Sequence, residues 1–361
     1  MSKKKKVAIL YGGRSVEHAV SVNSARNIYE FIDKNLFEPI PLGISKSGQW
    51  FLTTSVNKDI EQGKALGLIL DAVSPGFVLL SSGDRFKFDM IFPVLHGTDG
   101  EDGSIQGLIK AMDIPMVGTG VLGSALAMNK IVAKRLMRQV GLPVTDFLTY
   151  KYHEKDKITF TGISKKLGLP FMVKAASLGS SVGVTKVKTK ADFKKAIEDA
   201  FRYDDEMLVE EFVAGREIEC AILGNSPAEA SYPGEIEISK NYEFYTFDAK
   251  YVDPQAVQIH VPAKLSKPIA EKIRNVSIKA YEALHCQDFS RIDLFLDKKG
   301  KIYINEINTI PGFTNSSMYP MMWKERGISF SELITRLLNL AQERYNRGKR
   351  IERDFQSSLK F

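Results

Sequence analysis

The sequence predicts a mixed architecture, with a parallel α/β unit in the first third of the chain and an α+β region with a largely antiparallel sheet after it. Two observations support this prediction. Short apolar runs alternate with helix-period segments in the first third, which is the pattern of βαβ units. Beyond Val144 the apolar runs follow one another with fewer helical segments between them, which favours antiparallel pairing.

The individual elements follow from apolar periodicity and from turn residues. A long helical pattern ends at Gly141 and Pro143, which together form a stop signal, so a domain boundary fits there. The polar, aromatic and charged segment 241–254 is typical of a surface loop that closes over a site. We expect strands at 7–11, 39–44, 89–95, 170–175, 207–212, 217–223, 235–239, 292–296 and 302–306, and helices at 15–31, 104–112 and 122–140.

Length and composition indicate a globular protein of more than one domain. A chain of 361 residues with 44% hydrophobic and 26% charged side chains favours two or three domains, each burying its own core. No apolar run approaches the roughly 20 residues that cross a bilayer. We therefore expect a cytoplasmic protein without a membrane segment. Cys220 and Cys286 are far apart and lack metal-site spacing, so buried free thiols are expected.

The net charge of +7 is confined to the two ends of the chain. Lys3 to Lys6 contribute four positive charges, and residues 341–361 contribute three more, because six Lys or Arg face three Asp or Glu there. The body between these ends is neutral. A neutral body has no basic stripe for a phosphate backbone, so nucleic acid is not an expected partner.

The segment from Arg291 to Gly312 gives the strongest chemical signal. Two adjacent antiparallel strands would direct Asp293, Glu306 and Asn308 to one face, because residues two apart on a strand share a side. Three oxygen donors on a rigid sheet suit Mg²⁺, which takes its other ligands from water and phosphate. The alternative is a solvated face with a cross-strand charge pair, in which Asn308 is only a turn residue.

A second signal is an apolar strand that delivers Lys174, followed by the Gly/Ser-rich turn 179–183. Small residues let backbone N–H groups approach phosphate oxygens closely. The turn is not a Walker A loop, and a glycine-rich hairpin without a ligand is the alternative. Glu210, Glu211 and Glu217 flank a further strand crossover; ribose binding is possible there, but spacing alone favours solvated hairpin charges.

Two loops at expected strand ends carry candidate substrate residues. Glu17 lies where the first strand turns into a helix, and it either stabilises the helix dipole or receives a substrate ammonium group. His96 opens a glycine-rich polar loop after a later strand, and it is either structural or lines the same cleft. The dinucleotide fingerprint GxGxxG is absent, so a Rossmann cofactor is not expected.

Taken in order, these motifs resemble the D-alanine–D-alanine ligase family of the ATP-grasp superfamily from residue 7 to about 345. The resemblance implies an ATP-grasp fold with an N-terminal parallel α/β domain at 1–120 and two ATP-grasp subdomains at 121–218 and 219–361. The motifs that match are Gly12-Gly-Arg-Ser-Val-Glu-His, His96-Gly-Thr-Asp-Gly-Glu-Asp-Gly, Gly179-Ser-Ser-Val-Gly, Ala249-Lys-Tyr, Arg291-Ile-Asp and Asn305-Glu-Ile-Asn-Thr-Ile-Pro-Gly.

The resemblance also implies site residues for ATP. Lys134 and Lys174 would contact its phosphates, under a loop that includes Gly179, Ser181 and Val182. Lys250 would reach the γ-phosphate. Asp293, Glu306 and Asn308 would hold two Mg²⁺ ions, with Mn²⁺ as a possible substitute. At the base and sugar, the implied ATP-binding residues are Glu210, Val213 and Glu217.

For the amino acids, the resemblance implies that Glu17 binds the ammonium of the first D-alanine and Ser317 the carboxylate of the second, with His96 supporting the first pocket. Ser180 and Tyr251 would hydrogen-bond with Glu17 to close the lid, and Tyr251 would favour dipeptide over D-lactate products. Arg291 and the Gly312 backbone would stabilise the tetrahedral oxyanion.

The implied activity is ATP-dependent formation of D-alanyl-D-alanine through D-alanyl phosphate, for peptidoglycan precursor synthesis. The partners are D-alanine and ATP, and the family suggests a homodimer. Two alternatives stay open: a ligase that makes a D-alanine-D-lactate or D-alanine-D-serine product, and a non-catalytic ATP-binding regulator.

Overall fold

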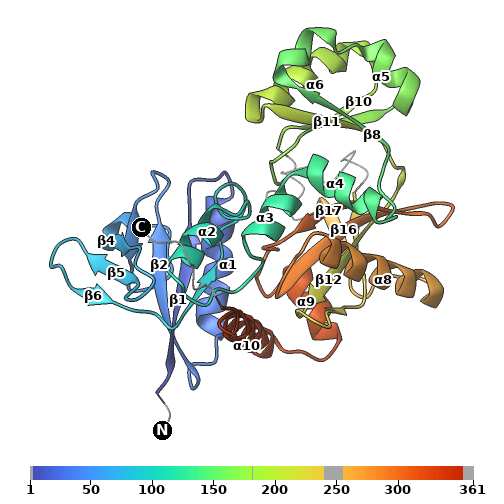
Figure 1. Cartoon of the computed structure of the whole chain (residues 1–361). Coiled ribbons are helices and arrows are strands. Elements are labelled where there is room, and N and C mark those ends of the chain that lie inside the picture. Colours follow the sequence, from blue (N-terminus) through green and yellow to red (C-terminus); the bar gives the residue numbers. More distant parts are fainter. Residues whose placement is uncertain (1–2, 181, 240–254, 353–361) are drawn as a thin grey trace, which may run out of the picture.

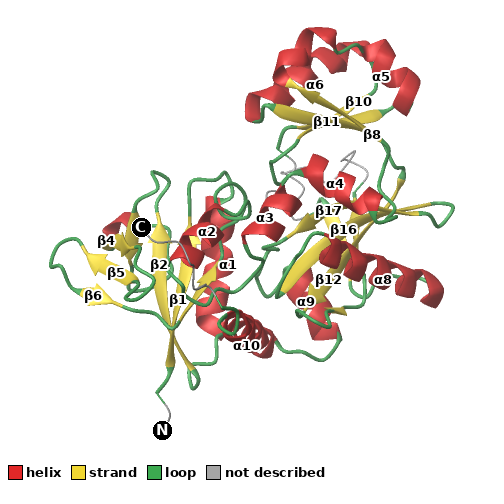
Figure 2. Cartoon of the chain, viewed as in Figure 1, coloured by secondary structure: helices red, strands yellow, loops and turns green. Residues whose placement is uncertain are grey.

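The computed structural model describes residues 3–180, 182–239 and 255–352, and these ranges form three β-sheets with helices around them. Figure 1 shows the first sheet beside the third sheet, with the small second sheet standing over the far end of the third. Helices pack on the faces of the sheets, and some of them lie between the first and third sheets (Figure 2). No helix among the described residues is both long enough and apolar enough to span a membrane.

The first sheet has seven strands in the order β6-β5-β4-β3-β2-β1-β7. The expected parallel unit is confirmed, because β1 pairs in parallel with both β2 and β7, and its last six residues are buried. The next four strands pair antiparallel and widen the sheet on one side. The strands are β1 (Lys5–Gly12), β2 (Phe37–Ile44), β3 (Trp50–Leu52), β4 (Lys64–Ile69), β5 (Gly76–Leu79), β6 (Arg85–Phe86) and β7 (Met90–Pro93), and η1 (Ile60–Gln62) precedes β4.

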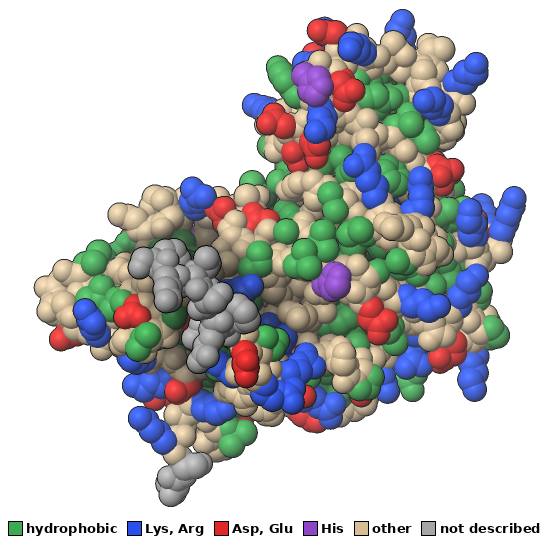
Figure 3. All heavy atoms as spheres, viewed as in Figure 1, with side chains coloured by type: hydrophobic (Ala, Val, Ile, Leu, Met, Phe, Trp, Pro, Cys, Tyr) green, Lys and Arg blue, Asp and Glu red, His purple; other side chains and the backbone are tan. Residues whose placement is uncertain are grey.

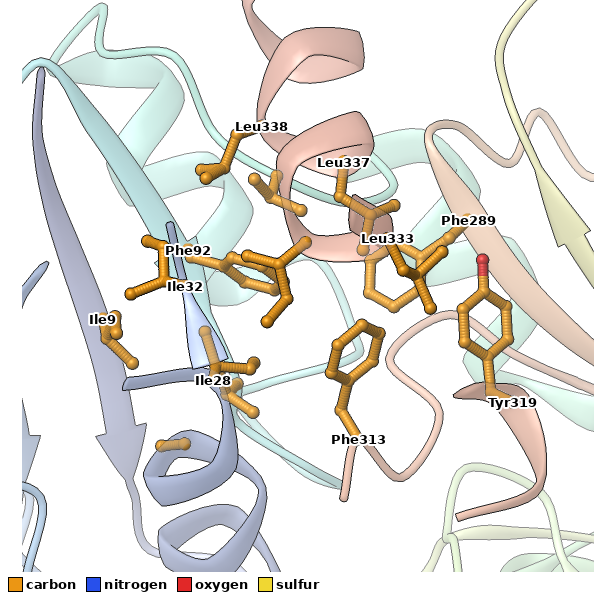
Figure 4. Close-up of a cluster of buried hydrophobic side chains, with 14 of the residues drawn as sticks. Ile9, Ile28, Ile32, Phe92, Phe289, Phe313, Tyr319, Leu333, Leu337 and Leu338 are labelled. Carbon is orange, nitrogen blue, oxygen red and sulfur yellow. The ribbon is translucent and has the colours of Figure 1, made fainter. Parts of the chain in front are cut away.

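Helices from both ends of the chain pack against this first sheet. Helices α1 (His18–Phe31) and α2 (Ser104–Ala111) confirm the two expected N-terminal helices. The C-terminal helix α10 (Phe330–Gly348) buries an apolar stripe against the same core. Figure 4 shows Leu337 and Leu338 of α10 above Phe92 of β7. The N-terminal unit and the C-terminal region therefore share one core.

The connection to the second sheet corrects one expectation. The helix expected at 122–140 is two helices, α3 (Val121–Met128) and α4 (Lys130–Gln139), with extended backbone at Asn129 between them. The Asn129 side chain accepts hydrogen bonds from the backbone N–H groups of Ile131 and Val132. Asparagine is a favoured N-cap because its side chain satisfies the free N–H groups of a first helical turn. The new helix therefore starts at a different angle.

Because α3 packs closely at Gly123, we expect a larger side chain at this position to destabilise the protein. A Cβ at this glycine would lie 2.4 Å from the backbone oxygen of His285, whereas a Cβ at Gly107 of α2 would meet nothing nearer than 3.9 Å. Alanine favours an exposed helix by about 1 kcal/mol over glycine. We expect Gly123→Ala to lower the free energy of unfolding by about 1 to 3 kcal/mol despite this gain, because the overlap forces backbone shifts.

Urea denaturation followed by far-UV circular dichroism measures the effect, and Gly107→Ala is the matched control. We expect the control to leave the free energy of unfolding unchanged or to raise it by up to about 1 kcal/mol. Equal effects of the two substitutions would show that the α3 contact tolerates a methyl group.

The second sheet is small and antiparallel, in the order β10-β9-β11-β8. Its apolar side packs on α5 and α6 around Phe171 and Ile197. The expected strands at 170–175 and 207–212 are confirmed. The elements are β8 (Phe147–Lys151), η2 (Tyr152–Lys157), α5 (Phe160–Leu167), β9 (Phe171–Ala175), β10 (Val184–Val187), α6 (Lys190–Tyr203) and β11 (Glu206–Glu211).

The third sheet is also antiparallel, with the order β15-β14-β12-β16-β17 and a short β13 paired with β12. All four expected strands are found. The proposed boundary between residues 218 and 219 falls inside β12, so we propose the turn between β11 and β12 in its place. The elements are β12 (Gly215–Leu223), β13 (Glu229–Ala230), β14 (Gly234–Ile238), β15 (Val257–His260), α8 (Lys267–Ala283), β16 (Phe289–Asp297), β17 (Ile302–Asn308) and α9 (Met318–Glu325).

The state of the two cysteines and the distribution of surface charge agree with what the sequence predicts. Cys220 and Cys286 are buried free thiols, and burial raises their pKa values to about 11 and about 12. On the face shown in Figure 3, Lys and Arg side chains are interspersed with Asp and Glu. That face has no continuous basic stripe of the kind that binds a nucleic-acid backbone.

Candidate active site

Two cavities of similar size meet on the third sheet. One, of about 480 Å³, is lined by β9 to β12, β14, β16 and β17. We call it the nucleotide cavity because of its lysines and acids. The other, of about 460 Å³, lies between the third sheet and the N-terminal unit, and we call it the acceptor cavity. Glu306 of β17 and Glu219 of β12 line both cavities and mark their junction.

A buried ion cluster forms the floor of the nucleotide cavity. The Glu210 carboxylate on β11 lies between two lysines: one oxygen contacts Lys174 Nζ, and the other lies 2.9 Å from Lys134 Nζ and accepts a 2.7 Å hydrogen bond from Thr145. All three charged side chains are nearly inaccessible to solvent. The interpretation of Glu210 as a solvated hairpin charge is therefore wrong, because the strand turns this side chain inward.

The cluster shifts the pKa values of its members. Burial disfavours the Glu210 carboxylate, but the two lysine charges outweigh burial and lower its pKa. Burial also lowers the pKa of Lys134. For Lys174, burial opposes the charged form, yet Glu210 outweighs it and the pKa rises. The pair Glu210 and Lys174 is therefore charged at neutral pH.

Of the two described lysines that the sequence predicts to bind phosphate, only one lines the nucleotide cavity. Lys174 lines the cavity, whereas Lys134 lies beneath it and is 1% exposed. Lys130 lines the cavity instead; its Nζ donates to the Leu178 backbone oxygen and lies 3.6 Å from Glu306. Lys130 was not among the residues predicted from the sequence. Its position one helical turn before Lys134, on the same face of α4, was the available signal.

The glycine-rich turn lies between the two cavities. It joins the antiparallel strands β9 and β10, and Val182 donates a backbone hydrogen bond to Gly179. Ser180 has a left-handed backbone (φ 53°), and its hydroxyl donates to the Glu17 carboxylate. A Cβ at Gly179 would lie 3.1 Å from Glu17 Oε2, so a glycine is favoured at this close approach. The expected contact between Ser180 and Glu17 is confirmed.

The remaining ATP-site predictions have mixed outcomes. Val213 and Glu217 line the nucleotide cavity at the connection between β11 and β12. Glu217 pairs in register with Ile236 of β14. Three predicted residues, Ser181, Lys250 and Tyr251, lie outside the described residues, as does the whole of the expected loop at 241–254.

The three expected metal donors lie on one face of β16 and β17. Asp293 pairs across the strands with Glu306, and Asn308 pairs with Arg291. The Asn308 side chain donates a 2.9 Å hydrogen bond to Asp293. Arg291 donates two hydrogen bonds of 2.7 Å to the same carboxylate. The alternative of a fully solvated face is wrong, because the Asp293 and Glu306 side chains are 15% and 23% exposed.

This donor set suits magnesium bound together with a nucleotide. Among the residues that the structure describes, no cluster of three or more His, Cys, Asp or Glu side chains would hold a metal ion by itself. Two carboxylates and an amide oxygen leave several positions for water and phosphate oxygens, as Mg²⁺ requires. The residues present therefore fit this metal when phosphates supply the other ligands.

The acceptor cavity collects the predicted amino-acid residues. Glu17 immediately precedes α1 and is 7% exposed, and Ser317 immediately precedes α9. The Ser317 hydroxyl accepts a 3.0 Å hydrogen bond from the Thr314 backbone. The predicted residues that line this cavity are Glu17, His96, Gly179, Ser180, Arg291, Glu306, Asn308, Gly312 and Ser317.

His96 links the N-terminal unit to the third sheet. Its Nδ1 lies 2.9 Å from the Ile310 backbone oxygen, and its Nε2 lies 3.1 Å from Ser24 Oγ. Burial lowers its pKa, so the neutral imidazole is favoured. A structural role and a place in the cavity lining are both observed, so the two interpretations of His96 do not exclude each other.

Glu101 is a further acid that lines this cavity, and it was not among the residues predicted from the sequence. Its two oxygens accept backbone hydrogen bonds from Gly97 at 2.8 Å and Ile310 at 3.0 Å. Burial, helped by the nearby Glu17 charge, raises its pKa to about 8. Its signal was the spacing His96-x₄-Glu101, which places both side chains on one polar loop.

The arrangement of two antiparallel sheets around a nucleotide-sized cavity is that of an ATP-grasp protein, with an N-terminal parallel unit completing a second cavity. Comparison with known proteins narrows this class. Family models described as the D-ala D-ala ligase N-terminus and C-terminus match residues 6–119 and 136–339. The chain therefore belongs to the D-alanine–D-alanine ligase family.

Individual relatives cover nearly the whole chain. A D-alanine–D-alanine ligase of Oceanobacillus iheyensis is 42% identical over 361 residues, covering 97% of this chain and 98% of the relative. The solved D-alanine-D-alanine ligase from Coxiella burnetii is 35% identical, with a TM-score of 0.84 over 97% of each chain. The solved VanG D-Ala:D-Ser ligase from Enterococcus faecalis is 36% identical, with a TM-score of 0.85 over 94% of this chain and 100% of that chain.

Proposed function

We propose that this protein joins two molecules of D-alanine to form D-alanyl-D-alanine, with hydrolysis of ATP to ADP and phosphate. One observation carries the proposal: Glu306 lies where the nucleotide cavity meets the acceptor cavity, so a phosphoryl group and an amino-acid carboxylate can meet there. The reaction then has two steps. A D-alanine carboxylate attacks the γ-phosphorus of ATP, and the amine of a second D-alanine displaces phosphate from the resulting acyl phosphate.

The first amino acid is oriented by the N-terminal unit. Its ammonium group pairs with Glu17, whose carboxylate is already fixed by the Ser180 hydroxyl. The neutral His96 beside it adds no opposing positive charge. This orientation directs the substrate carboxylate toward the junction of the cavities. Holding the reacting groups in one geometry removes much of the entropic barrier to the first step.

The first step brings two anions together, and cations of the chain offset their repulsion. Like charges 4 Å apart repel by about 4 kcal/mol at an effective dielectric constant of 20. Lys130 and Lys174 line the nucleotide cavity, and Gly179 and Ser180 of the glycine-rich turn line the acceptor cavity. We propose that both lysines bind phosphate oxygens and that Lys134 acts through Glu210. Lys250 is proposed to reach the γ-phosphate.

Two Mg²⁺ ions held by Asp293, Glu306 and Asn308, or Mn²⁺ in their place, would neutralise phosphate charge and align the terminal phosphoryl group. In the second step the free amine of the second D-alanine attacks the acyl carbon. Ser317 binds the carboxylate of this amino acid, while Arg291 and the Gly312 backbone stabilise the oxyanion. Atoms balance because phosphate leaves as the amide bond forms and the amine loses a proton.

The second amino acid defines the alternative function. The similarity to a D-Ala:D-Ser ligase favours D-serine as the competing acceptor, with D-lactate as a second one. Identities of 42% and 43% over nearly the whole chain to proteins named D-alanine–D-alanine ligase support the dipeptide product. By the same resemblance we propose a cytoplasmic homodimer that supplies a peptidoglycan precursor.

Phosphate release from Mg-ATP by the purified protein tests the proposal. We expect release that depends on D-alanine, with D-alanyl-D-alanine as the product by mass spectrometry and little release with L-alanine. Adding D-serine or D-lactate to D-alanine ranks the acceptors by product ratio. Binding of ATP without any D-alanine-dependent release would contradict the ligase assignment and favour a non-catalytic ATP-binding protein.

A further inference from the structure

Glu219 is a buried carboxylate at the junction of the two cavities, and none of the roles above includes it. It is 4% exposed and lines both cavities from the middle of β12. The strand register places it directly opposite Asp293 of β16. Burying a carboxylate is costly unless a cation compensates it, so a residue in this position requires a partner.

That partner is Arg291. Its Nε lies 3.0 Å from Glu219 Oε2 and 2.7 Å from Asp293 Oδ1. Arg291 precedes Asp293 by two residues on the same strand, so all three side chains share one face of the sheet. The guanidinium group is thus held between two carboxylates, and only 16% of its side chain is exposed.

Asp293 and Glu219, the two carboxylates that contact Arg291, differ in whether they belong to the proposed metal site. Asp293 is a proposed metal ligand, and in this structure both of its oxygens accept hydrogen bonds from Arg291. If Asp293 held a metal ion, its attraction for the guanidinium group would be weaker, because the carboxylate would share its lone pairs with the ion. Glu219 lies on a different strand and belongs to no proposed metal site. It can therefore hold Arg291 independently of the metal.

We propose that Glu219 is a positioning residue of the ligation reaction, which fixes the Arg291 guanidinium group at the junction of the two cavities. This inference rests on the proposed function. It assigns to Glu219 no contact with substrate: the carboxylate acts through Arg291, which faces the acceptor cavity. Mutating the partners that orient metal-ligating residues typically costs ten- to hundredfold in activity, and we expect an effect of the same size for Glu219.

The kinetic test compares Glu219→Gln, Glu219→Asp and a control, Glu229→Gln. Glu229 lies on the neighbouring strand β13 with a 63% exposed side chain, 3.8 Å from Arg326. We expect Glu219→Gln to lower kcat about ten- to hundredfold, with the KM for ATP changed less than about twofold. Glu219→Asp keeps the charge and should recover part of the loss. The control should retain wild-type kinetics.

A double-mutant comparison separates positioning from simple stability. In an Arg291→Lys background, adding Glu219→Gln should change kcat by less than about twofold, because the group that Glu219 orients is already gone. Equal losses of kcat in both backgrounds would overturn the proposal. So would a Glu219→Gln variant with wild-type kcat, or one whose lost activity is fully explained by a smaller folded fraction in thermal melts.

A spectroscopic readout does not depend on activity. The Arg291 Nε–H signal in a ¹H–¹⁵N spectrum can be assigned by its loss in Arg291→Lys. We expect it to persist in the wild type with and without Mg-ADP, and to broaden in Glu219→Gln when Mg-ADP is added. A signal that stays sharp in that variant would refute the positioning role. If the wild type shows no D-alanine-dependent phosphate release, the proposed function fails, while this spectrum still tests Glu219.

Discussion

Replacing Glu306 by glutamine is expected to reduce D-alanine-dependent phosphate release by about a thousandfold or more, a loss at the upper end of those seen when one preorganised charge-stabilising group is removed. Glu306 lines both cavities and lies 3.6 Å from Lys130. The change removes one negative charge and keeps the size of the side chain. It therefore weakens the metal site and leaves Lys130 without that counter-charge.

The fold should survive this change, because the Glu306 side chain is 23% exposed and borders a cavity. Circular dichroism and the thermal midpoint should match those of the wild type. Glu229→Gln on β13 changes a carboxylate that is 63% exposed, lies 3.8 Å from Arg326 and lines neither cavity, so it serves as an exposed comparison on the same sheet. Wild-type turnover in Glu306→Gln would show that Glu306 is not a metal ligand. Asp293 and Asn308 alone would then be too few protein ligands for the proposed magnesium site.

The site on β16 and β17 was predictable because its signal is local. Asp293, Glu306 and Asn308 alternate with apolar residues, and the period of two in a strand fixes their common face before any fold is known. The turn that contains Ser180 was predictable for the same reason, since a glycine-rich run directly after an apolar strand is a short-range pattern. The common strand face and the turn are both observed, while their roles in a site stay predictions.

The floor of the nucleotide cavity was not predictable, because its partners are distant in the sequence. Nothing in the residues around Glu210 indicates that Lys134 and Lys174 flank it, and its local pattern suggested a solvated hairpin. The inward direction of the side chain is set by how β11 pairs with β8 and β9. Glu219 was missed for a related reason, since only the register of β12 with β16 places it opposite Asp293.

The break between helices α3 and α4 was also not predictable from the sequence. The apolar pattern runs through 122–140 without interruption, yet the chain breaks the helix at Asn129. Asparagine is tolerated within helices and favoured at their starts, so the residue alone does not decide between the two. Tertiary packing decides, because the Asn129 side chain also donates to Ser177 near the glycine-rich turn. A contact across 48 positions is invisible to a periodicity argument.

Replacing Glu210 by glutamine is expected to lower the free energy of unfolding at pH 7 by about 3 to 5 kcal/mol, the usual cost of removing one partner from a buried ion pair. Glu210 is 1% exposed and its carboxylate contacts both Lys134 and Lys174. Glutamine leaves these two buried cations facing a neutral amide. Urea denaturation at pH 7 measures the change, with the Glu332→Gln variant on α10 as control.

The control removes an exposed ion pair, because the side chains of Arg336 and Glu332 are 46% and 45% exposed. Exposed pairs contribute about 0 to 1 kcal/mol, so Glu332→Gln should change the free energy of unfolding by no more than that. A loss in Glu210→Gln as small as in the control would show that the cluster contributes little to stability. The difference between the two variants therefore isolates the effect of burial.

The lowered pKa of Glu210 fixes the direction in which the free energy of unfolding changes with pH. The folded-state pKa of Glu210 is lowered below its ordinary value of 4.5, so its stabilisation is present above pH 4.5 and is lost as the pH falls through the folded-state pKa. The wild type should therefore lose stability in acid more steeply than Glu210→Gln. In the variant, loss of the counter-charge lowers the pKa of Lys134 further and removes the main cause that raises the pKa of Lys174. Its stability should then rise as the pH approaches 10.5, the ordinary lysine value.

A second substitution distinguishes an uncompensated charge from lost packing. If the cost of Glu210→Gln comes from two unbalanced lysines, adding Lys134→Met removes one of them and should restore part of the lost free energy of unfolding. Lys134 does not line the nucleotide cavity, so this change leaves Lys130 and Lys174 in its lining. If the double variant is instead less stable than Glu210→Gln, packing around Lys134 and its bond to Thr145 dominate the cost.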